Sequence, residues 1–252
     1  MERLKTASLF IIVVLATVCL AACGGGADGS ASGAGKSVYL MTKSTSYNPD
    51  GTVSIEVNKE YDEQGNLTKS VYDYKNMTLG IVETEYSDFD EHGYPKTITQ
   101  TDGSGEARTV LHEYTIENGH AVKESSNGVS VEYEYYADGK LKSTKSNGGN
   151  QKTSRQYNEK GLPTQWLTEA EDFTKETIFE WEFDDKGYVK SYTSTIKMRE
   201  IKDMPTKYDV ECDENGNVIL ASRDGVLANK YEYVRIDNPS KFAWISSWHS
   251  WF

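Results

Sequence analysis

The stretch Tyr61-Asp62-Glu63-Gln64-Gly65-Asn66-Leu67-Thr68 decides the fold, because near-copies of it recur along the chain. In most copies an aromatic residue precedes an Asp or Asn, two variable residues follow, and a Gly leads into a new apolar run. The copies are Tyr47-Asn48-Pro49-Asp50-Gly51 (partial), Phe89-Asp90-Glu91-His92-Gly93, Tyr114-Thr115-Ile116-Glu117-Asn118-Gly119 (degenerate), Tyr135-Tyr136-Ala137-Asp138-Gly139, Tyr157-Asn158-Glu159-Lys160-Gly161, Phe183-Asp184-Asp185-Lys186-Gly187 and Cys212-Asp213-Glu214-Asn215-Gly216.

The repeat predicts a hairpin turn on backbone grounds. A type I turn favours Asp or Asn at its first position, where the carboxylate or amide oxygen accepts hydrogen bonds from backbone N–H groups two residues on. When such a turn closes a hairpin, the next residue usually has a positive φ, which favours Gly. Asp62 and Gly65 occupy these two positions, and the flanking Tyr61 and Leu67 suit paired strands.

Apolar and charged residues alternate between the turns, as expected of strands with one buried and one solvated face. Val131, Tyr133 and Tyr135 alternate with Glu132 and Glu134. A second, less regular set of turns falls between the repeats, at Asp102-Gly103, Asn127-Gly128, Asn147-Gly148-Gly149, Asp203-Met204-Pro205 and Asp224-Gly225. The sequence therefore predicts an all-β fold, a long antiparallel meander of about 15 strands over residues 37–237 that is curved or partly closed.

The N-terminus indicates export and membrane anchoring. Arg3 and Lys5 precede an apolar run of signal-peptide length, which ends in Leu20-Ala21-Ala22-Cys23-Gly24. Small residues before a Cys are typical of a bacterial lipobox, so we expect residues 1–22 to be removed and Cys23 to carry the lipid, diacylglyceryl with palmitate-like chains. The alternative is an ordinary secretory signal with an incidental Cys. Residues 23–36 would be a flexible tether with a reach of roughly 20 Å.

Residues 238–252 change in character and are rich in aromatic side chains. Trp244, Trp248 and Trp251 have the i, i+4, i+7 spacing of one helix face. We expect a short helix or aromatic tail that covers the open end of the sheet, with a membrane-interface helix as the alternative. These three residues and Trp181 are the candidate binding residues.

The repeat resembles the YD-repeat, or RHS-repeat, family of bacterial surface and secreted proteins. The matching segments are Tyr61-Asp62 with Gly65-Asn66-Leu67, Phe183-Asp184 with Gly187-Tyr188-Val189, and Cys212-Asp213 with Gly216-Asn217-Val218. The resemblance covers roughly residues 45 to 225 and implies a hairpin meander. Large members wind such hairpins into shells around a toxin or other cargo. This chain resembles a small envelope lipoprotein of that type without a toxin domain.

Residues capable of catalysis or metal binding form no recognisable motif, so we expect no enzyme activity and no cofactor. Cys212 alone remains in the mature domain, in the aromatic position of its repeat, and a buried thiol is expected. His92, His112, His120 and His249 lack zinc-ligand spacing. Calcium at Asp213-Glu214-Asn215-Gly216-Asn217 is an alternative, although the turn itself explains these residues.

The charge disfavours nucleic acid as a partner. The chain has 39 acidic and 27 basic residues, a formal net charge of −12, and removal of residues 1–22 makes it more acidic by one charge. Three functions stay open: a membrane-anchored binding module for a glycan, peptide or protein; a half-barrel carrier or chaperone for an apolar ligand such as lipid, with the C-terminal segment as lid; and a hydrolase with unrecognised carboxylates.

Overall fold

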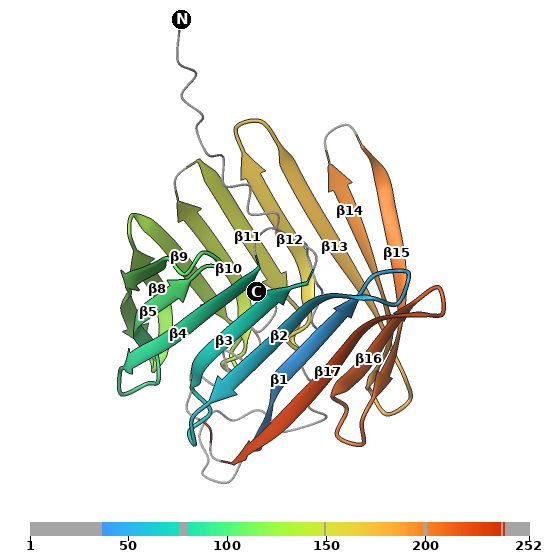
Figure 1. Ribbon diagram of the computed structural model, residues 1–252, viewed down its shortest axis with the longest axis horizontal. Coiled ribbons are helices and arrows are strands. Elements are labelled where there is room, and N and C mark those ends of the chain that lie inside the picture. Colours follow the sequence, from blue (N-terminus) through green and yellow to red (C-terminus); the bar gives the residue numbers. More distant parts are fainter. Residues whose placement is uncertain (1–36, 76–79, 149, 199–200, 238, 240–252) are drawn as a thin grey trace, which may run out of the picture.

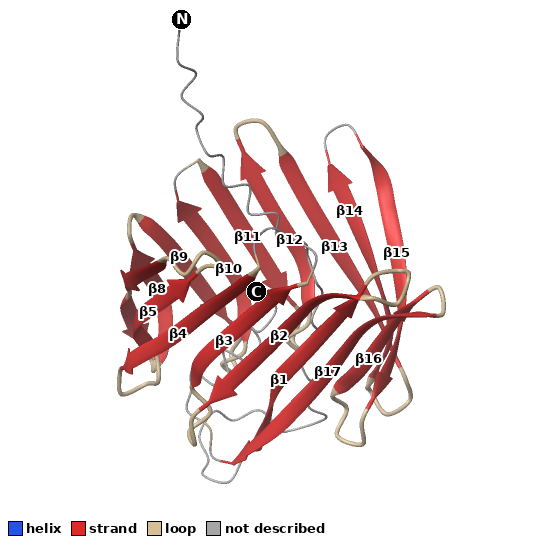
Figure 2. Cartoon of the chain, in the orientation of Figure 1, coloured by secondary structure: helices blue, strands red, loops and turns tan. Residues whose placement is uncertain are grey.

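A computed structural model describes residues 37–75, 80–148, 150–198, 201–237 and 239, and within them the chain forms 17 β-strands and no helix (Figures 1 and 2). The first nine strands are β1 (Ser37–Tyr47), β2 (Val53–Tyr61), β3 (Leu67–Tyr74), β4 (Ile81–Phe89), β5 (Pro95–Thr101), β6 (Ala107–Leu111), β7 (Glu113–Glu117), β8 (His120–Ser126) and β9 (Val129–Tyr135). The other eight are β10 (Leu141–Gly148), β11 (Gln151–Tyr157), β12 (Pro163–Ala170), β13 (Thr174–Phe183), β14 (Val189–Met198), β15 (Ile201–Cys212), β16 (Val218–Arg223) and β17 (Val226–Asp237).

Each strand pairs antiparallel with the next in the chain, with one exception between β6 and β7. The last strand, β17, returns to pair with β1, so that Ser37 opposes Asp237. The sheet therefore curves round on itself into a nearly closed, barrel-like form, as Figure 1 shows. The predicted all-β antiparallel meander is confirmed, with 17 strands in the described residues where the sequence indicated about 15.

The exception between β6 and β7 is where the ring of ladders is interrupted. β6 pairs with β5, β7 pairs with β8, and His112 alone separates β6 from β7 in the chain. β6 and β7 are therefore two halves of one bent strand. Its first half pairs with β5, and its second half pairs with β8. If β6 and β7 are counted as one strand, the number of strands in the described residues is even. An up-and-down sheet needs an even number for its first and last strands to pair antiparallel.

The repeated motif has the predicted turn geometry. Gly65 N–H donates to the Asp62 carbonyl at 3.0 Å, and Gly65 has a φ of +79°. The Asp62 carboxylate accepts hydrogen bonds from the backbone N–H groups of Gln64 and Asn66 at 3.0 and 2.8 Å. The same backbone bonds recur in the turns that begin at Asn48, Asp90, Asp102, Tyr136, Asn158, Asp184 and Asp213. The motif is a type I hairpin turn followed by a glycine bulge.

Two turns differ in type from the sequence-based prediction. The Asp102 turn belongs to the regular set, because its closing glycine is Gly105 and not Gly103. Asn118-Gly119 is not a degenerate repeat: both residues have positive φ, +52° and +77°, and Glu117 opposes His120 directly. This is the two-residue turn that Asn-Gly favours, and Asn127-Gly128 and Asp224-Gly225 form the same type.

The predicted turn at Asp203-Met204-Pro205 is wrong, since these residues lie within β15, where Pro205 opposes Thr195 of β14. Proline lacks the N–H that a central strand needs, so it is confined to positions with one free edge. The ladder between β15 and β16 begins at Asp209, so β15 has no partner on that side at Pro205 within the described residues. The edge position explains why proline is compatible with the strand.

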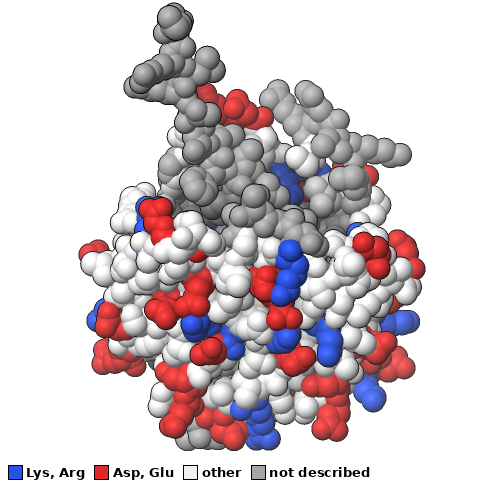
Figure 3. Space-filling model, viewed as in Figure 1, with Lys and Arg blue, Asp and Glu red and all other residues white. Residues whose placement is uncertain are grey.

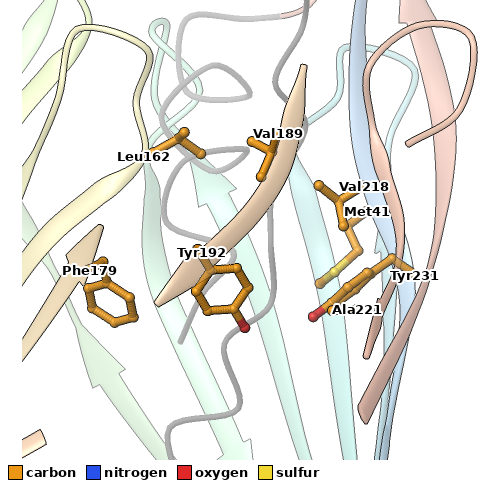
Figure 4. Packing of buried hydrophobic residues seen from close by; sticks show 8 residues of the cluster. All are labelled: Met41, Leu162, Phe179, Val189, Tyr192, Val218, Ala221 and Tyr231. Carbon is orange, nitrogen blue, oxygen red and sulfur yellow. The ribbon is translucent and has the colours of Figure 1, made fainter. Parts of the chain in front are cut away.

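The largest hydrophobic cluster lies on the inner face of β1 and β12–β17. Its buried members are Met41, Leu162, Phe179, Val189, Tyr192, Val218, Ala221 and Tyr231 (Figure 4). Along β13, buried Phe179 alternates with exposed Glu180 and Glu182. The buried face of a sheet that closes on itself is its inner face, so these rings point inward. Two smaller clusters lie elsewhere, around Leu40 and around Tyr94.

Charged side chains of both signs are scattered among uncharged ones on the face seen in Figure 3. Several form cross-strand ion pairs, such as Lys43 with Glu56 at 3.0 Å and Lys69 with Glu83 at 2.7 Å. Mixed charges of this kind are typical of a solvated surface. In the part of the chain that the structure describes, no helix is long and apolar enough to span a membrane.

Candidate functional site: the inner aromatic wall

A continuous row of aromatic rings crosses four neighbouring strands on the inner face. We call Trp166, Phe179, Trp181, Tyr192 and Tyr208 the aromatic wall. Ring centroids are 4.8 Å apart for Trp166 and Phe179, 6.4 Å for Phe179 and Trp181, 4.9 Å for Trp181 and Tyr192, and 4.6 Å for Tyr192 and Tyr208. Such spacings are those of favourable aromatic pairs. The wall is an apolar surface built from flat rings.

Strand register explains how these rings come together. Trp181 opposes Tyr192 on β14, and Tyr192 opposes Tyr208 on β15, so these rings stack side by side. Trp166 and Phe179 instead oppose the small residues Thr177 and Ser194, respectively. A small partner leaves room for a large ring to lean across the strand toward its diagonal neighbour. The row therefore follows from alternating large and small residues in register.

A cation and a buried phenol lie at one end of the wall. Arg155 on β11 directly opposes Trp166, and its Cζ atom lies 5.6 Å from the Trp166 ring centroid. Burial lowers the pKa of Arg155 to about 10. Tyr157, two residues further on the same strand, is 3% exposed, and burial raises the pKa of its phenol to about 12. This end of the wall combines a flat ring surface with a buried positive charge.

Two hydrogen-bond donors at this end are buried. The Tyr157 hydroxyl and the Trp166 indole nitrogen have no hydrogen-bond partner among the residues that the structure describes. By contrast, Trp181 Nε1 donates to the Pro163 carbonyl at 2.7 Å. Most buried polar groups in proteins are paired, and each exception calls for a reason.

A second polar cluster closes the break between β6 and β7. We call Tyr94, His112, Tyr114, Ala121, Glu124, Tyr133 and Tyr135 the closure seam. Glu124 contacts His112 Nδ1 at 2.5 Å and accepts a hydrogen bond from the Tyr133 hydroxyl. Burial and the nearby Glu124 charge raise the pKa of Tyr133. Both carboxylate oxygens are thus engaged, so this cluster serves as a structural link across the sheet.

A groove of about 380 Å³ lies over β7–β10 and is lined mainly by charged residues. Glu132 and Glu134 line it and alternate with Tyr133, which packs with the inner cluster, so the groove is on the outer face. Glu134 is bonded to Ser143 at 3.0 Å and to Lys145 at 3.5 Å. One hydrogen bond and one ion pair of this kind are typical of an ordinary charged surface.

Of the four predicted binding residues, one lies within the part of the chain that the structure describes. Trp181 lies in the aromatic wall between Phe179 and Tyr192. Trp244, Trp248 and Trp251 lie outside the described residues, as does the predicted lipidation site Cys23. Sequence reasoning missed Trp166, Tyr192, Tyr208, Arg155 and Tyr157 as site residues. Alternation along a strand identified which face Trp181 occupies, but the register between strands was needed to find the others.

The other residues considered from the sequence, Cys212 and the Asp213 turn, make contacts that stabilise the fold. The Cys212 thiol donates to the Val189 carbonyl at 3.4 Å, and burial raises its pKa to about 11. The Asp213 carboxylate accepts bonds from Asn215 and Asn217 within its own turn. Across the described ranges no group of three or more His, Cys, Asp or Glu side chains is arranged to hold a metal ion.

Comparison with known proteins gives distant structural neighbours. No protein-family model and no curated protein matches the sequence. A porin-like protein from Bacteroides uniformis superposes with a TM-score of 0.39 and 12% identity, over 79% of this chain and 91% of that one. A TcdB2-TccC3 structure matches with a TM-score of 0.33 and 11% identity, over 82% of this chain and 15% of that one. This chain thus has a distant, β-rich relationship to both.

Proposed function

We propose that this protein is a small, non-catalytic binding protein of the bacterial cell envelope, exported and anchored through a lipid on Cys23. Its ligand site is the aromatic wall on the inner face of the sheet. The observation that carries the proposal is the continuous row of rings from Trp166 to Tyr208, which ends beside the buried Arg155. Aromatic faces recognise sugar rings, aromatic groups and other apolar surfaces through dispersion and stacking.

The anchoring part of the proposal rests on the N-terminal sequence. Small residues before Cys23 and the glycine-rich tether support a lipoprotein of the YD-repeat type, which the repeated turns resemble. An acylated Cys23 would hold the barrel-like domain at the outer side of the membrane, within the roughly 20 Å reach of its tether. The acidic, mixed-charge outer surface supports a domain that is solvated there.

A second candidate function is that of a carrier for a wholly apolar ligand. The inward orientation of the apolar side chains Phe179 and Tyr192 favours it (Figure 4). A carrier would copurify with bound lipid, whereas a binding protein for a polar partner would not. Organic extraction of purified protein followed by mass spectrometry separates the two, because a stoichiometric apolar compound supports the carrier.

The wall itself is tested with the neutral fluorescent probe N-phenyl-1-naphthylamine. Saturable binding with increased fluorescence is expected for the full mature chain. Trp166→Leu keeps an apolar side chain but removes the indole ring, and should weaken binding about tenfold. The matched control is Phe173→Leu, whose aromatic side chain is 43% exposed and makes no ring contact with the wall in the described residues, and it should leave binding unchanged. Absence of probe binding to the unmutated protein contradicts the proposed site.

The anchor has a separate test. Cys23→Ser removes the thiol that would be acylated, so the protein should move from the membrane fraction to the soluble extracytoplasmic fraction. Metabolic labelling with a palmitate analogue should mark the unmutated protein and leave the variant unlabelled. Membrane retention of an unlabelled variant would refute lipid anchoring at this residue.

A further inference from the structure

β6 and β7 are the two edges of the sheet within the described residues. β6 pairs only with β5 and β7 only with β8, whereas every other strand there has a partner on both sides. β8 ends at Ser126, one residue beyond the partner of Glu113. No described strand therefore continues alongside β6. We call the side of β6 that faces away from β5 the free edge.

The register with β5 shows which backbone groups point to the free edge. His112 N–H donates to the Lys96 carbonyl at 2.8 Å, one step beyond the last pair of the β5–β6 register. Hydrogen-bonded and non-hydrogen-bonded pairs alternate along an antiparallel ladder. Val110 and Arg108 alternate in step with His112, and they therefore exchange hydrogen bonds with β5. The N–H and C=O groups that point to the free edge are those of Ala107, Thr109 and Leu111.

The side chains along the free edge are open to solvent. Ala107, Arg108 and Thr109 are exposed, and Leu111 is 68% exposed, more than any other large apolar residue in the described part of the chain. β6 has no proline or lysine, and its register with β5 has no shift. Edge strands are usually protected by such residues or by a bulge, and an unprotected edge accepts a further strand.

Size and charge disfavour a second copy of this chain as that further strand. A stable dimer interface takes about 20–30 residues from each side, and β6 has five. Each copy has a formal net charge of −12, so two copies repel each other. A single extended polypeptide segment needs less area, because main-chain hydrogen bonds supply much of its affinity.

The charges around the free edge favour a basic segment. Glu106 precedes β6 and Glu113 follows it, and both are exposed. Neither belongs to an ion pair within the described residues. Arg108 is the one basic residue of β6. On an extended strand the two carboxylates lie roughly 23 Å apart, so basic residues about seven positions apart in a segment would reach both.

We propose that β6 binds an extended, basic polypeptide segment of a partner protein by strand addition at the free edge. The segment bonds to the backbone of Ala107, Thr109 and Leu111, and one of its apolar side chains covers Leu111. Its basic residues pair with Glu106 and Glu113. This edge lies on β6, outside the aromatic wall on β12–β15, so it adds a protein partner that does not depend on a ligand at the wall.

A synthetic peptide of eight residues is the probe. It has lysine at both ends, alternating threonine and valine between them, blocked termini and a fluorescent label. Fluorescence anisotropy should show saturable binding to the full mature chain, weakened by added salt because the end charges are exposed. The control peptide has proline in place of each valine, which keeps the charge and removes backbone donors. It should bind at least about tenfold more weakly.

Two proline variants of the protein test the direction of the hydrogen bonds. Thr109→Pro removes an N–H that points to the free edge, so it should weaken the peptide about tenfold and leave the urea midpoint nearly unchanged. Val110→Pro removes an N–H that bonds to β5, so it should lower the urea midpoint clearly. Equal loss of stability in the two variants would overturn the assignment of the free edge.

Leu111→Lys is a variant that keeps the backbone intact. It puts a cation where the basic segment docks and should weaken the peptide about tenfold. The matched control is Val226→Lys on β17, at a side chain that is 44% exposed, and it should change the affinity by less than about twofold. Equal effects of the two variants would mean that the peptide senses only the net charge of the protein.

Amide hydrogen exchange locates the added strand. In the free protein the Thr109 and Leu111 amides should exchange fast, and those of Arg108 and Val110 slowly. Saturation with the peptide should slow exchange at Thr109 and Leu111 at least about tenfold. Binding that leaves these two amides unprotected would show that the peptide docks elsewhere.

The outcomes separate this edge from the proposed function. N-phenyl-1-naphthylamine should bind to the Leu111→Lys variant as it binds to the unmutated chain. If the peptide does not bind to the unmutated chain, or if its proline version binds equally well, strand addition is wrong while the wall stands. If the peptide binds and the naphthylamine does not, the wall is wrong and the free edge stands. A dimer in sedimentation that Thr109→Pro abolishes would identify a second copy as the occupant and overturn the basic partner.

Discussion

The aromatic wall and the closure seam are held by different contacts. In the wall, neighbouring rings from β12 to β15 pack against each other face to face or edge to face. In the seam, tyrosine hydroxyl groups form hydrogen bonds with the backbone. Tyr94 OH accepts a hydrogen bond from Ala121 N–H at 2.9 Å, and Tyr114 OH donates to the Pro95 carbonyl at 3.0 Å. These bonds link the start of β5 to β7 and β8, where no backbone ladder runs. Stacking stabilises the wall, and directed hydrogen bonds close the seam.

The difference follows from the backbone beneath each region. Under the wall, continuous backbone hydrogen-bond ladders join the strands. The side chains there contribute mainly through apolar packing. At the seam, β6 and β7 have different partners, and side chains have to bridge what the ladder leaves open. Substitutions in the wall should therefore act through lost packing, and those in the seam through unsatisfied polar groups.

The largest effect is expected from a wall ring. Phe179→Ala should lower the free energy of unfolding by about 3–5 kcal/mol, because it removes a ring that is 3% exposed and leaves a cavity. Phe173→Ala, at a ring that is 43% exposed, should change it by no more than about 0.5 kcal/mol. Urea denaturation measures both. Similar losses in the two variants would mean that the wall contributes no special packing.

A seam hydroxyl should have a smaller and more local effect. Tyr94→Phe leaves the Ala121 N–H buried without its acceptor, so we expect a loss of about 1–3 kcal/mol. Hydrogen exchange should quicken at Ala121 and along β7 and β8, with little change in β13 and β14. The control is Tyr188→Phe, which removes an exposed hydroxyl bonded to the Glu214 carbonyl and should cost less than about 0.5 kcal/mol. Uniform acceleration across the sheet would argue against a local seam.

The turns allow a finer comparison. Asp184, in the turn between β13 and β14, accepts bonds from the Lys186 and Tyr188 N–H groups, both at 2.9 Å. Asp184→Ala should cost about 1 kcal/mol. In the turn between β9 and β10 the first position is Tyr136, and Asp138 accepts a single backbone bond, from Lys140. Asp138→Ala should therefore cost less, and a thermal unfolding series that reverses this order would contradict the assigned roles.

The smallest effect concerns pH, and here the two regions should behave alike on their outer faces. Hydrogen bonds from Ser191 and Lys207 lower the pKa of Glu182, and a hydrogen bond from Ser143 with the charge of Lys145 lowers the pKa of Glu134. A folded-state pKa below the unfolded value means that each contributes stability above the unfolded pKa, about 4.3, and loses it as pH falls through the folded pKa.

Glu182→Gln and Glu134→Gln should each flatten the fall in stability below about pH 5 slightly, as measured by urea denaturation between pH 3 and pH 7. Both side chains are exposed, so the changes should be small and similar. If one variant changed the pH dependence of stability much more than the other, the two regions would differ in their outer-face charges as well as in their inner-face contacts.

Local features of this fold were readable from the sequence, and long-range ones were not. The side chain of Asp62 and the missing side chain of Gly65 predict the turn type directly. The alternation of apolar and charged residues around Trp181 predicts which face of the sheet Trp181 occupies. Pro205 misled because the sequence does not reveal that β16 is shorter than β15 and leaves its edge unpaired. The wall depends on register: Tyr192 meets Tyr208 across β14 and β15, although each looks like any other alternating tyrosine.

The pairing of Ser37 with Asp237 sets an order on how this chain reaches its final form. Hairpins such as β13–β14 join neighbouring residues and can form as soon as both strands are present. The ladder between β1 and β17 joins the two ends of the domain, so the entropy of closing the whole chain opposes it until the last strand is in place. Up to that moment β1 offers an open edge to any other strand nearby. Slow final closure, with a transient tendency to pair between molecules, is the expected kinetic signature of such a ring.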